Sequence, residues 1–125
     1  MSALLTYAIG DIHGCYTQLR SLIHRCMAHR GDNPYRLICL GDYIDRGRRS
    51  RETVELLIEL QASLPEQIVC LSGNHERMAV AAARGGDPWA WLANGGIATL
   101  HSYGVGSAEQ IPSGLDGLAA ALVCR

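Results

Sequence analysis

The sequence contains no lysine, and all 11 of its basic residues are arginine. Set against 12 acidic residues, they give a net charge of −1. A nearly neutral chain is not attracted to the phosphates of nucleic acid or of a membrane surface, so we expect neither as a partner. Arginine binds anions through two parallel N–H groups, so the exclusive use of arginine favours such bidentate contacts where the function needs them. A GC-rich genome is the simpler explanation for the absence of lysine.

The five cysteines lack the pattern of a disulfide framework or a zinc knuckle, because their number is odd and no two form a CxxC pair. Cys39 and Cys70 lie in apolar runs, where a free cysteine packs as a small hydrophobic residue. This usage predicts a reducing, cytoplasmic location. No basic segment precedes the first apolar stretch, and no window approaches ~18 apolar residues, so we expect neither a signal peptide nor a membrane span.

The 125 residues suit one domain, and 48% hydrophobic residues with 18% charged ones provide a real core. Apolar runs predict strands at residues 4–9, 35–40 and 67–71. Apolar residues at helical spacing predict helices near residues 19–30, 50–64, 74–84, 88–92 and 115–123. Within this pattern Ser50 is expected as an N-cap and residues 94–96 as a turn, while residues 98–103 are ambiguous. Alternating strands and helices predict an α/β domain with a mostly parallel sheet and flanking helices.

A polar block follows each predicted strand. The blocks read GDIHG at residues 10–14, GDYIDRG at residues 41–47 and GNHE at residues 73–76. Residues just past the carboxyl end of a strand lie in the crevice where open α/β sheets bind ligands. Asp, His and Asn are suitable metal ligands, so three such blocks at one sheet edge indicate a metal site.

Taken singly, each block also has an ordinary structural explanation. Asp11 suits a helix cap, and Asp45 with Arg46 suits a salt bridge in a solvated loop. Asn74 suits a helix N-cap followed by a surface histidine, His75. The ordered set of three is much more specific than any one member.

As a set, the blocks resemble the GDxHG, GDxxDRG and GNHE motifs of the phosphoprotein phosphatase branch of the calcineurin-like metallophosphoesterases. The resemblance covers about residues 5–105, and residues 91–96 and 99–104 are similar to the bacterial and phage-type Ser/Thr protein phosphatases. It implies the first half of a metallophosphatase αββα sandwich. Residues 1–125 are therefore expected to form a single, incomplete catalytic domain.

The resemblance implies two divalent metal ions. Asp11 and His13 would bind the first ion, Asp42 would bridge both, and Asn74 would bind the second. Mixed Asp, Asn and His ligation suits manganese, iron or zinc better than calcium, and manganese is expected.

The resemblance also implies the catalytic residues. A water activated by the two metals would attack phosphorus, and His75 would act as general acid on the leaving alkoxide. Asp45 would orient His75, and the planar fork of Arg46 would hold phosphate oxygens. A phosphorylated protein or a small phosphoester is the expected substrate.

The sequence departs from the family pattern in two ways. The family's two later metal-binding histidines are expected beyond residue 125, and His101 does not resemble either. Many relatives also place arginine before GNHE, where this chain has Ser72. Two alternatives therefore stay open beside a protein phosphatase: a symmetrical dinucleoside tetraphosphatase, a group that usually reads GNHD, and an inactive fragment or binding module.

Other conspicuous residues are expected to be structural. Arg48, Arg49 and Arg51 suit a solvated loop and helix start. Trp89 and Trp91 are expected to anchor packing rather than to stack on bases.

Overall fold

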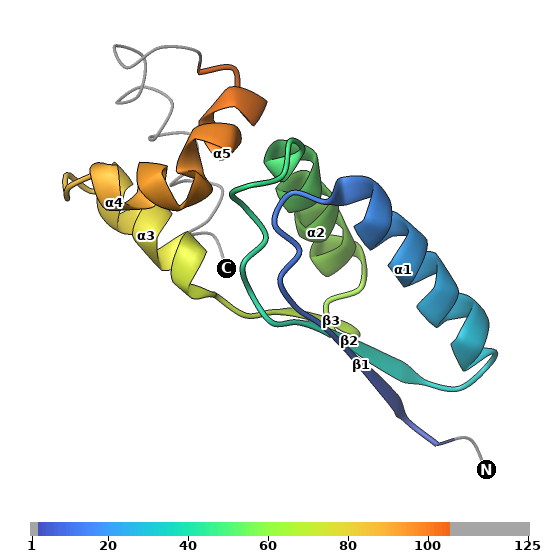
Figure 1. Cartoon of the computed structure of the whole chain (residues 1–125). Coiled ribbons are helices and arrows are strands. Elements are labelled where there is room, and N and C mark those ends of the chain that lie inside the picture. Colours follow the sequence, from blue (N-terminus) through green and yellow to red (C-terminus); the bar gives the residue numbers. More distant parts are fainter. Residues whose placement is uncertain (1–2, 106–125) are drawn as a thin grey trace.

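A three-stranded parallel sheet lies at the centre of the chain, whose residues 3–105 are described by a computed structural model (Figure 1). Its strands are β1 (Leu5–Ile9), β2 (Tyr35–Cys39) and β3 (Ile68–Cys70), in the order β1-β2-β3. The predicted α/β class with a parallel sheet is confirmed. The third strand is shorter than predicted, because residues 67 and 71 lie outside the ladder.

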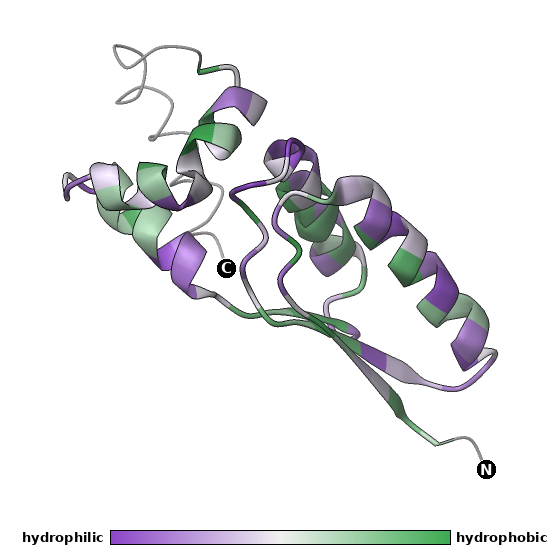
Figure 2. Cartoon of the chain, viewed as in Figure 1, coloured by the Kyte–Doolittle hydropathy of each residue, from purple (hydrophilic) through white to green (hydrophobic). Residues whose placement is uncertain are grey.

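Two helices cover one face of this sheet and connect its strands. They are α1 (Tyr16–Arg30) and α2 (Ser50–Ser63), and Figure 1 shows both on the same side. Figure 2 shows strands that are mostly apolar, with a hydrophilic segment in β2, and helices of mixed polar and apolar character that pack on them. Leu19 of α1, Leu57 of α2 and Leu37 of β2 are all buried in the shared core. Burial of such side chains is the main stabilising term of the layer, at about 1.5–3 kcal/mol each.

The opposite face of the sheet is apolar towards the carboxyl ends of the strands, while Thr6 and Arg36 lie on it nearer the amino ends. Ala8, Ile38 and Val69 are paired across the three strands and point to this side, since side chains alternate between faces. Leu40 and Leu71 continue the row and are 50% and 48% exposed. None of the helices within residues 3–105 covers this face (Figure 1).

A second group of helices lies beyond the carboxyl end of β3. It contains α3 (Asn74–Ala83), α4 (Trp89–Trp91), the π-helical turn η1 (Leu92–Gly96) and α5 (Ile97–Ser102). The predicted turn at 94–96 is a kink inside this helical run, with non-helical backbone angles at Asn94 and Gly95. The ambiguous stretch 98–103 is largely helical. The helix predicted at 115–123 lies outside the described residues.

Two local predictions are wrong. Ser50 is the first residue of α2 rather than its N-cap, and its buried hydroxyl accepts a hydrogen bond from the backbone N–H of Asp45. Trp89 is 67% exposed, so it anchors no packing, whereas Trp91 is buried. Across residues 3–105, no helix combines the length and apolar character that crossing a bilayer requires.

Candidate metal centre

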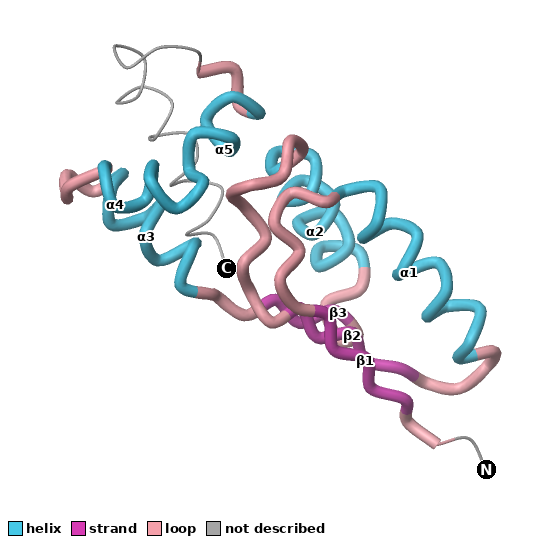
Figure 3. Tube along the Cα trace, in the orientation of Figure 1, coloured by secondary structure: helices cyan, strands magenta, loops and turns pink. Residues whose placement is uncertain are grey.

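Two loops at the carboxyl ends of β1 and β2 form the floor of the site. The first loop (residues 10–15) and the second loop (residues 40–49) run side by side in Figure 3. The backbone N–H of His13 donates to the carbonyl of Asp42 at 2.9 Å, and the N–H of Gly47 donates to the carbonyl of His13 at 3.0 Å. A Cβ atom on Gly47 would lie 2.0 Å from the His13 oxygen, so only glycine permits this approach. The first two polar blocks are thereby joined through their backbones.

The backbone of these loops is held in an uncommon conformation. Among the described residues other than glycine, the ones with positive φ are Asp11 (50°), His13 (43°), Asp42 (58°), Asp45 (77°) and Arg46 (72°). Residues with a Cβ rarely adopt this left-handed region, and they stay there where surrounding contacts hold them. Such positions cluster at functional sites, and here they coincide with residues of the first two motifs.

Asp11, His13 and Asp42 form a cluster suited to a cation. One ligand atom from each lies within 4.8 Å of the others. His13 Nδ1 donates to the carbonyl of Ile44 at 2.8 Å, so the lone pair of its Nε2 is free. This Nε2 lies 4.0 Å from a carboxylate oxygen of Asp11. Two carboxylates and a correctly oriented imidazole are a donor set that fits a divalent transition metal.

Asn74 extends this cluster towards α3. One end of its side-chain amide lies 3.1 Å from both carboxylate oxygens of Asp42. With nitrogen at that end, Asn74 donates to Asp42; with oxygen there, three oxygens converge on one point, as they do around a cation. The backbone N–H of His75 also donates to Asp42 at 3.0 Å, which fixes the carboxylate between the second loop and α3. With its oxygen at that end, Asn74 adds one oxygen donor beside the carboxylate of Asp42.

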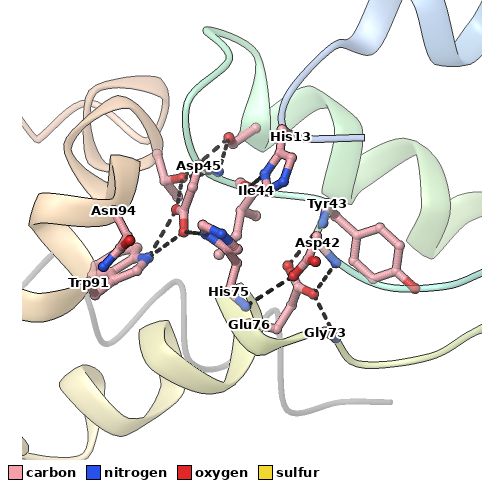
Figure 4. A network of polar contacts seen from close by, with 12 residues as sticks. His13, Asp42, Tyr43, Ile44, Asp45, Gly73, His75, Glu76, Trp91 and Asn94 are labelled. Atoms are coloured by element: carbon pink, nitrogen blue, oxygen red, sulfur yellow. Dashed lines mark hydrogen bonds and ion pairs between the residues drawn. The ribbon is translucent and has the colours of Figure 1, made fainter. Parts of the chain in front are cut away.

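Glu76 joins the second loop to the start of α3, a role that the sequence analysis missed. Its buried carboxylate accepts three backbone N–H groups: Asp42 at 2.6 Å, Gly73 at 2.9 Å and Tyr43 at 3.0 Å (Figure 4). Glutamate at the third position of a helix commonly reaches back to its N-cap, and this pattern was a signal for the contact with Gly73. Nothing local signals the contacts with Asp42 and Tyr43, which lie on another loop.

His75 and Asp45 form a buried pair beside the cluster. His75 Nδ1 donates to a carboxylate oxygen of Asp45 at 2.6 Å, and the two residues are 4% and 0% exposed. The imidazole of His75 packs edge-on against that of His13, with ring centroids 4.6 Å apart. Figure 4 shows His75 between Asp45 on one side and Asp42 on the other. Because Nδ1 carries the proton bound by Asp45, Nε2 is the atom left for proton transfer.

The structure brings Arg46 to the site only through its backbone. Its N–H donates to the carbonyl of Gly95 at 3.1 Å, while its side chain is exposed and its guanidinium makes no hydrogen bond to any described residue. Two of the neighbouring arginines are paired with acids on α2: Arg49 with Glu52, and Arg51 with Glu55. The pairing with Glu55 raises the pKa of Arg51. His101 is exposed and lies outside the metal-ligand cluster.

Comparisons with known proteins agree with this geometry. A family model described as calcineurin-like phosphoesterase matches residues 4–114. One similar solved structure carries a provisional designation as a diadenosine tetraphosphatase; it is 20% identical, with a TM-score of 0.55, over 99% of this chain and 47% of that one. Another is a protein serine/threonine phosphatase from Saccharomyces cerevisiae with similarity to human phosphatase PP5; it is 24% identical, with a TM-score of 0.49, over 61% of this chain and 26% of that one. The chain thus spans less than half the length of either structure, and the first of them supports the fold.

Proposed function

Because the chain belongs to the calcineurin-like phosphoesterase family, we propose that it is a metal-dependent phosphoester hydrolase of the Ser/Thr protein phosphatase type. The observation that carries the proposal is that two groups of side chains lie next to each other at one edge of the sheet. One is the Asp11, His13 and Asp42 cluster with Asn74 beside it. The other is the buried pair of His75 and Asp45. A metal site next to an oriented histidine is what hydrolysis of a phosphoester requires.

The residues divide into ligands and a general acid. Asp11 and His13 would hold one ion, Asp42 would bridge to a second, and Asn74 would complete the set that this chain offers. When bound, two divalent ions, of which manganese is the expected one, supply Lewis-acid stabilisation of the phosphoryl oxygens and activate a water for attack on phosphorus.

His75 would give the proton that the departing alkoxide needs. Asp45 holds the Nδ1–H, so Nε2 is directed away from Asp45 towards the reacting group. Arg46, exposed and with a guanidinium that bonds no described residue, would swing to bind phosphate oxygens in a bidentate contact. Asp45 and Arg46 both have left-handed backbone conformations. These conformations would set the distance between the general acid His75 and the guanidinium of Arg46.

The GNHE reading of the third block, with Glu76 at its end, resembles the protein phosphatase branch, and this resemblance favours a phosphoprotein over a dinucleoside tetraphosphate as substrate. The tetraphosphatase group usually has aspartate at this position, one methylene shorter. Here the longer carboxylate reaches three backbone N–H groups at 2.6–3.0 Å and is matched to this spacing. Turnover of a serine phosphopeptide should therefore exceed turnover of diadenosine tetraphosphate under the same conditions, and the reverse order would select the second substrate class.

Metal binding and hydrolysis of p-nitrophenyl phosphate with manganese test the proposal. We expect His75→Gln to bind manganese as the unmodified chain does but to lose about 10²–10⁴-fold in kcat. His101→Gln, a change of an exposed histidine on α5, is the matched control and should keep both properties. A chain that binds manganese without metal-dependent turnover, or a His75→Gln variant as fast as its parent, would contradict the hydrolase assignment.

One observation favours the alternative of an inactive binding module. The row of apolar residues on the open sheet face includes Leu40 and Leu71, each about half exposed. Exposed apolar surface of this kind drives association between copies of a chain. Bound manganese without turnover, together with concentration-dependent dimerisation in sedimentation experiments, would support that alternative.

A further inference from the structure

We propose that Trp91 and Thr99 are positioning residues for the general acid. They hold the carboxylate of Asp45 in the orientation in which it accepts the hydrogen bond from His75. The inference rests on the proposed role of His75 and extends it to residues from a separate part of the chain, 46 and 54 positions away from Asp45.

The carboxylate of Asp45 is surrounded by three donors (Figure 4). The indole Nε1 of Trp91 lies 2.9 Å from Oδ1 and 2.8 Å from Oδ2, so it donates between the two oxygens. The hydroxyl of Thr99 donates to Oδ1 at 2.6 Å, and His75 donates to Oδ2 at 2.6 Å. Asp45 is 0% exposed, so water does not replace a lost donor from the solvent side. A buried carboxylate needs hydrogen-bond donors to compensate for the loss of water. Here the three donors also fix the orientation of the two carboxylate oxygens.

The backbone of Asp45 is held by the same hydroxyl. Its N–H donates to Thr99 Oγ1 at 2.8 Å and to Ser50 Oγ at 3.1 Å. Thr99 therefore accepts from the backbone and donates to the side chain of one residue, which restricts both φ and the side-chain rotamer. Asp45 has a φ of 77°, a conformation that requires such external support.

Residues 91–99 act as one element in this arrangement. Trp91 and Thr99 lie on either side of the kink at Asn94 and Gly95, and both donate to the carboxylate of Asp45. Gly95, at the kink, accepts the backbone N–H of Arg46 at 3.1 Å. The element thus contacts Asp45 and Arg46, two neighbouring residues that both have left-handed backbones.

Packing alone does not account for Trp91. The indole is 1% exposed, and a phenyl ring would fill most of the same space, but only the indole N–H reaches the carboxylate. Trp89 offers a contrast two residues earlier, because its side chain is 67% exposed. Trp91→Phe removes the donor and keeps an aromatic ring, and Trp89→Phe makes the same chemical change on the surface.

The first measurement is independent of catalysis. In ¹⁵N-labelled protein, the His75 Nδ1–H and the Trp91 indole N–H should give slowly exchanging signals in the unmodified chain and in Trp89→Phe. In Trp91→Phe and Thr99→Val we expect the His75 Nδ1–H to exchange with solvent about tenfold faster or to be lost. Thr99→Ser keeps the hydroxyl and should restore the signal. Circular dichroism establishes that each variant is folded.

The second measurement separates positioning from structure in turnover with manganese. A poor leaving group such as phenolate needs the general acid, whereas 2,4-dinitrophenolate does not. Trp91→Phe should lower kcat about 10–100-fold for phenyl phosphate, with KM unchanged and little effect on 2,4-dinitrophenyl phosphate. Thr99→Val should behave likewise, and Thr99→Ser should be close to the parent.

The two measurements distinguish a failure of the proposed hydrolase function from a failure of the proposed role of Trp91 and Thr99. A parent chain that shows the His75 signal but no turnover contradicts the proposed hydrolase, while the exchange rates still decide whether Trp91 and Thr99 hold the pair. Folded Trp91→Phe and Thr99→Val variants with an unchanged His75 Nδ1–H signal overturn the inference. Equal losses for both leaving groups overturn it as well.

Discussion

Replacement of Glu76 by glutamine should destabilise the protein although the two side chains have nearly the same shape. The carboxylate of Glu76 accepts two N–H groups on Oε1, from Asp42 and Gly73, and one on Oε2, from Tyr43. Glutamine keeps one oxygen for the first two donors but turns its NH₂ group towards the N–H of Tyr43. Donor then faces donor in a place where the side chain is only 4% exposed.

The expected loss follows from these contacts. A hydrogen bond to a charged acceptor contributes about 1.5–3 kcal/mol, and an unsatisfied buried donor costs about 1–3 kcal/mol. The variant should therefore lose about 3–5 kcal/mol of unfolding free energy, a large fraction of the ~5–15 kcal/mol of a typical domain. The melting temperature should fall by more than about 10 °C. The loss is large because the carboxylate of Glu76 accepts three backbone N–H groups at once, two from the second loop and one from Gly73.

Urea unfolding followed by circular dichroism measures this difference. Glu66→Gln is the matched control, because Glu66 is exposed and makes no hydrogen bond within the described residues; it should stay within about 0.5 kcal/mol of the parent. Glu76→Asp should be intermediate, since its carboxylate stays charged but is one methylene too short. A Glu76→Gln variant as stable as Glu66→Gln would show that Glu76 does not join the two loops.

Three further outcomes are expected. In Gly73→Ala the new Cβ would lie 2.3 Å from a carboxylate oxygen of Asp42, so manganese binding measured by calorimetry should be lost; unchanged affinity would exclude Asp42 as a ligand. Manganese at a hundred times its Kd should stabilise the unmodified chain by about 2.7 kcal/mol but leave His13→Ala unaffected, as read from thermal unfolding; equal shifts would place the ion elsewhere. A hydrogen bond with Cys70 and burial raise the pKa of the Cys39 thiol. At pH 8 iodoacetamide should therefore label exposed Cys15 and spare Cys39 in mass spectra; early labelling of Cys39 would contradict its buried state.

The sequence by itself determined the strand order along the chain and the edge at which the polar blocks gather. Apolar runs and helical spacing are local patterns, and parallel strands bring their carboxyl ends to one edge by geometry alone. For this reason Asp11, His13 and Asp42 could be placed together before any coordinates were known, and the structure puts their ligand atoms within 4.8 Å.

Only the tertiary structure decided how these residues are held. Three features have no signature in their own neighbourhoods: the left-handed backbones of Asp45 and Arg46, the contacts of Glu76 with the second loop, and the indole N–H on Asp45. Trp91 looked like a packing residue because its local pattern is apolar. The contacts of Glu76 with Asp42 and Tyr43, and of Asp45 with Trp91, join residues more than 30 positions apart. Such distances are closed by the packing of helices and loops rather than by any local preference of the chain.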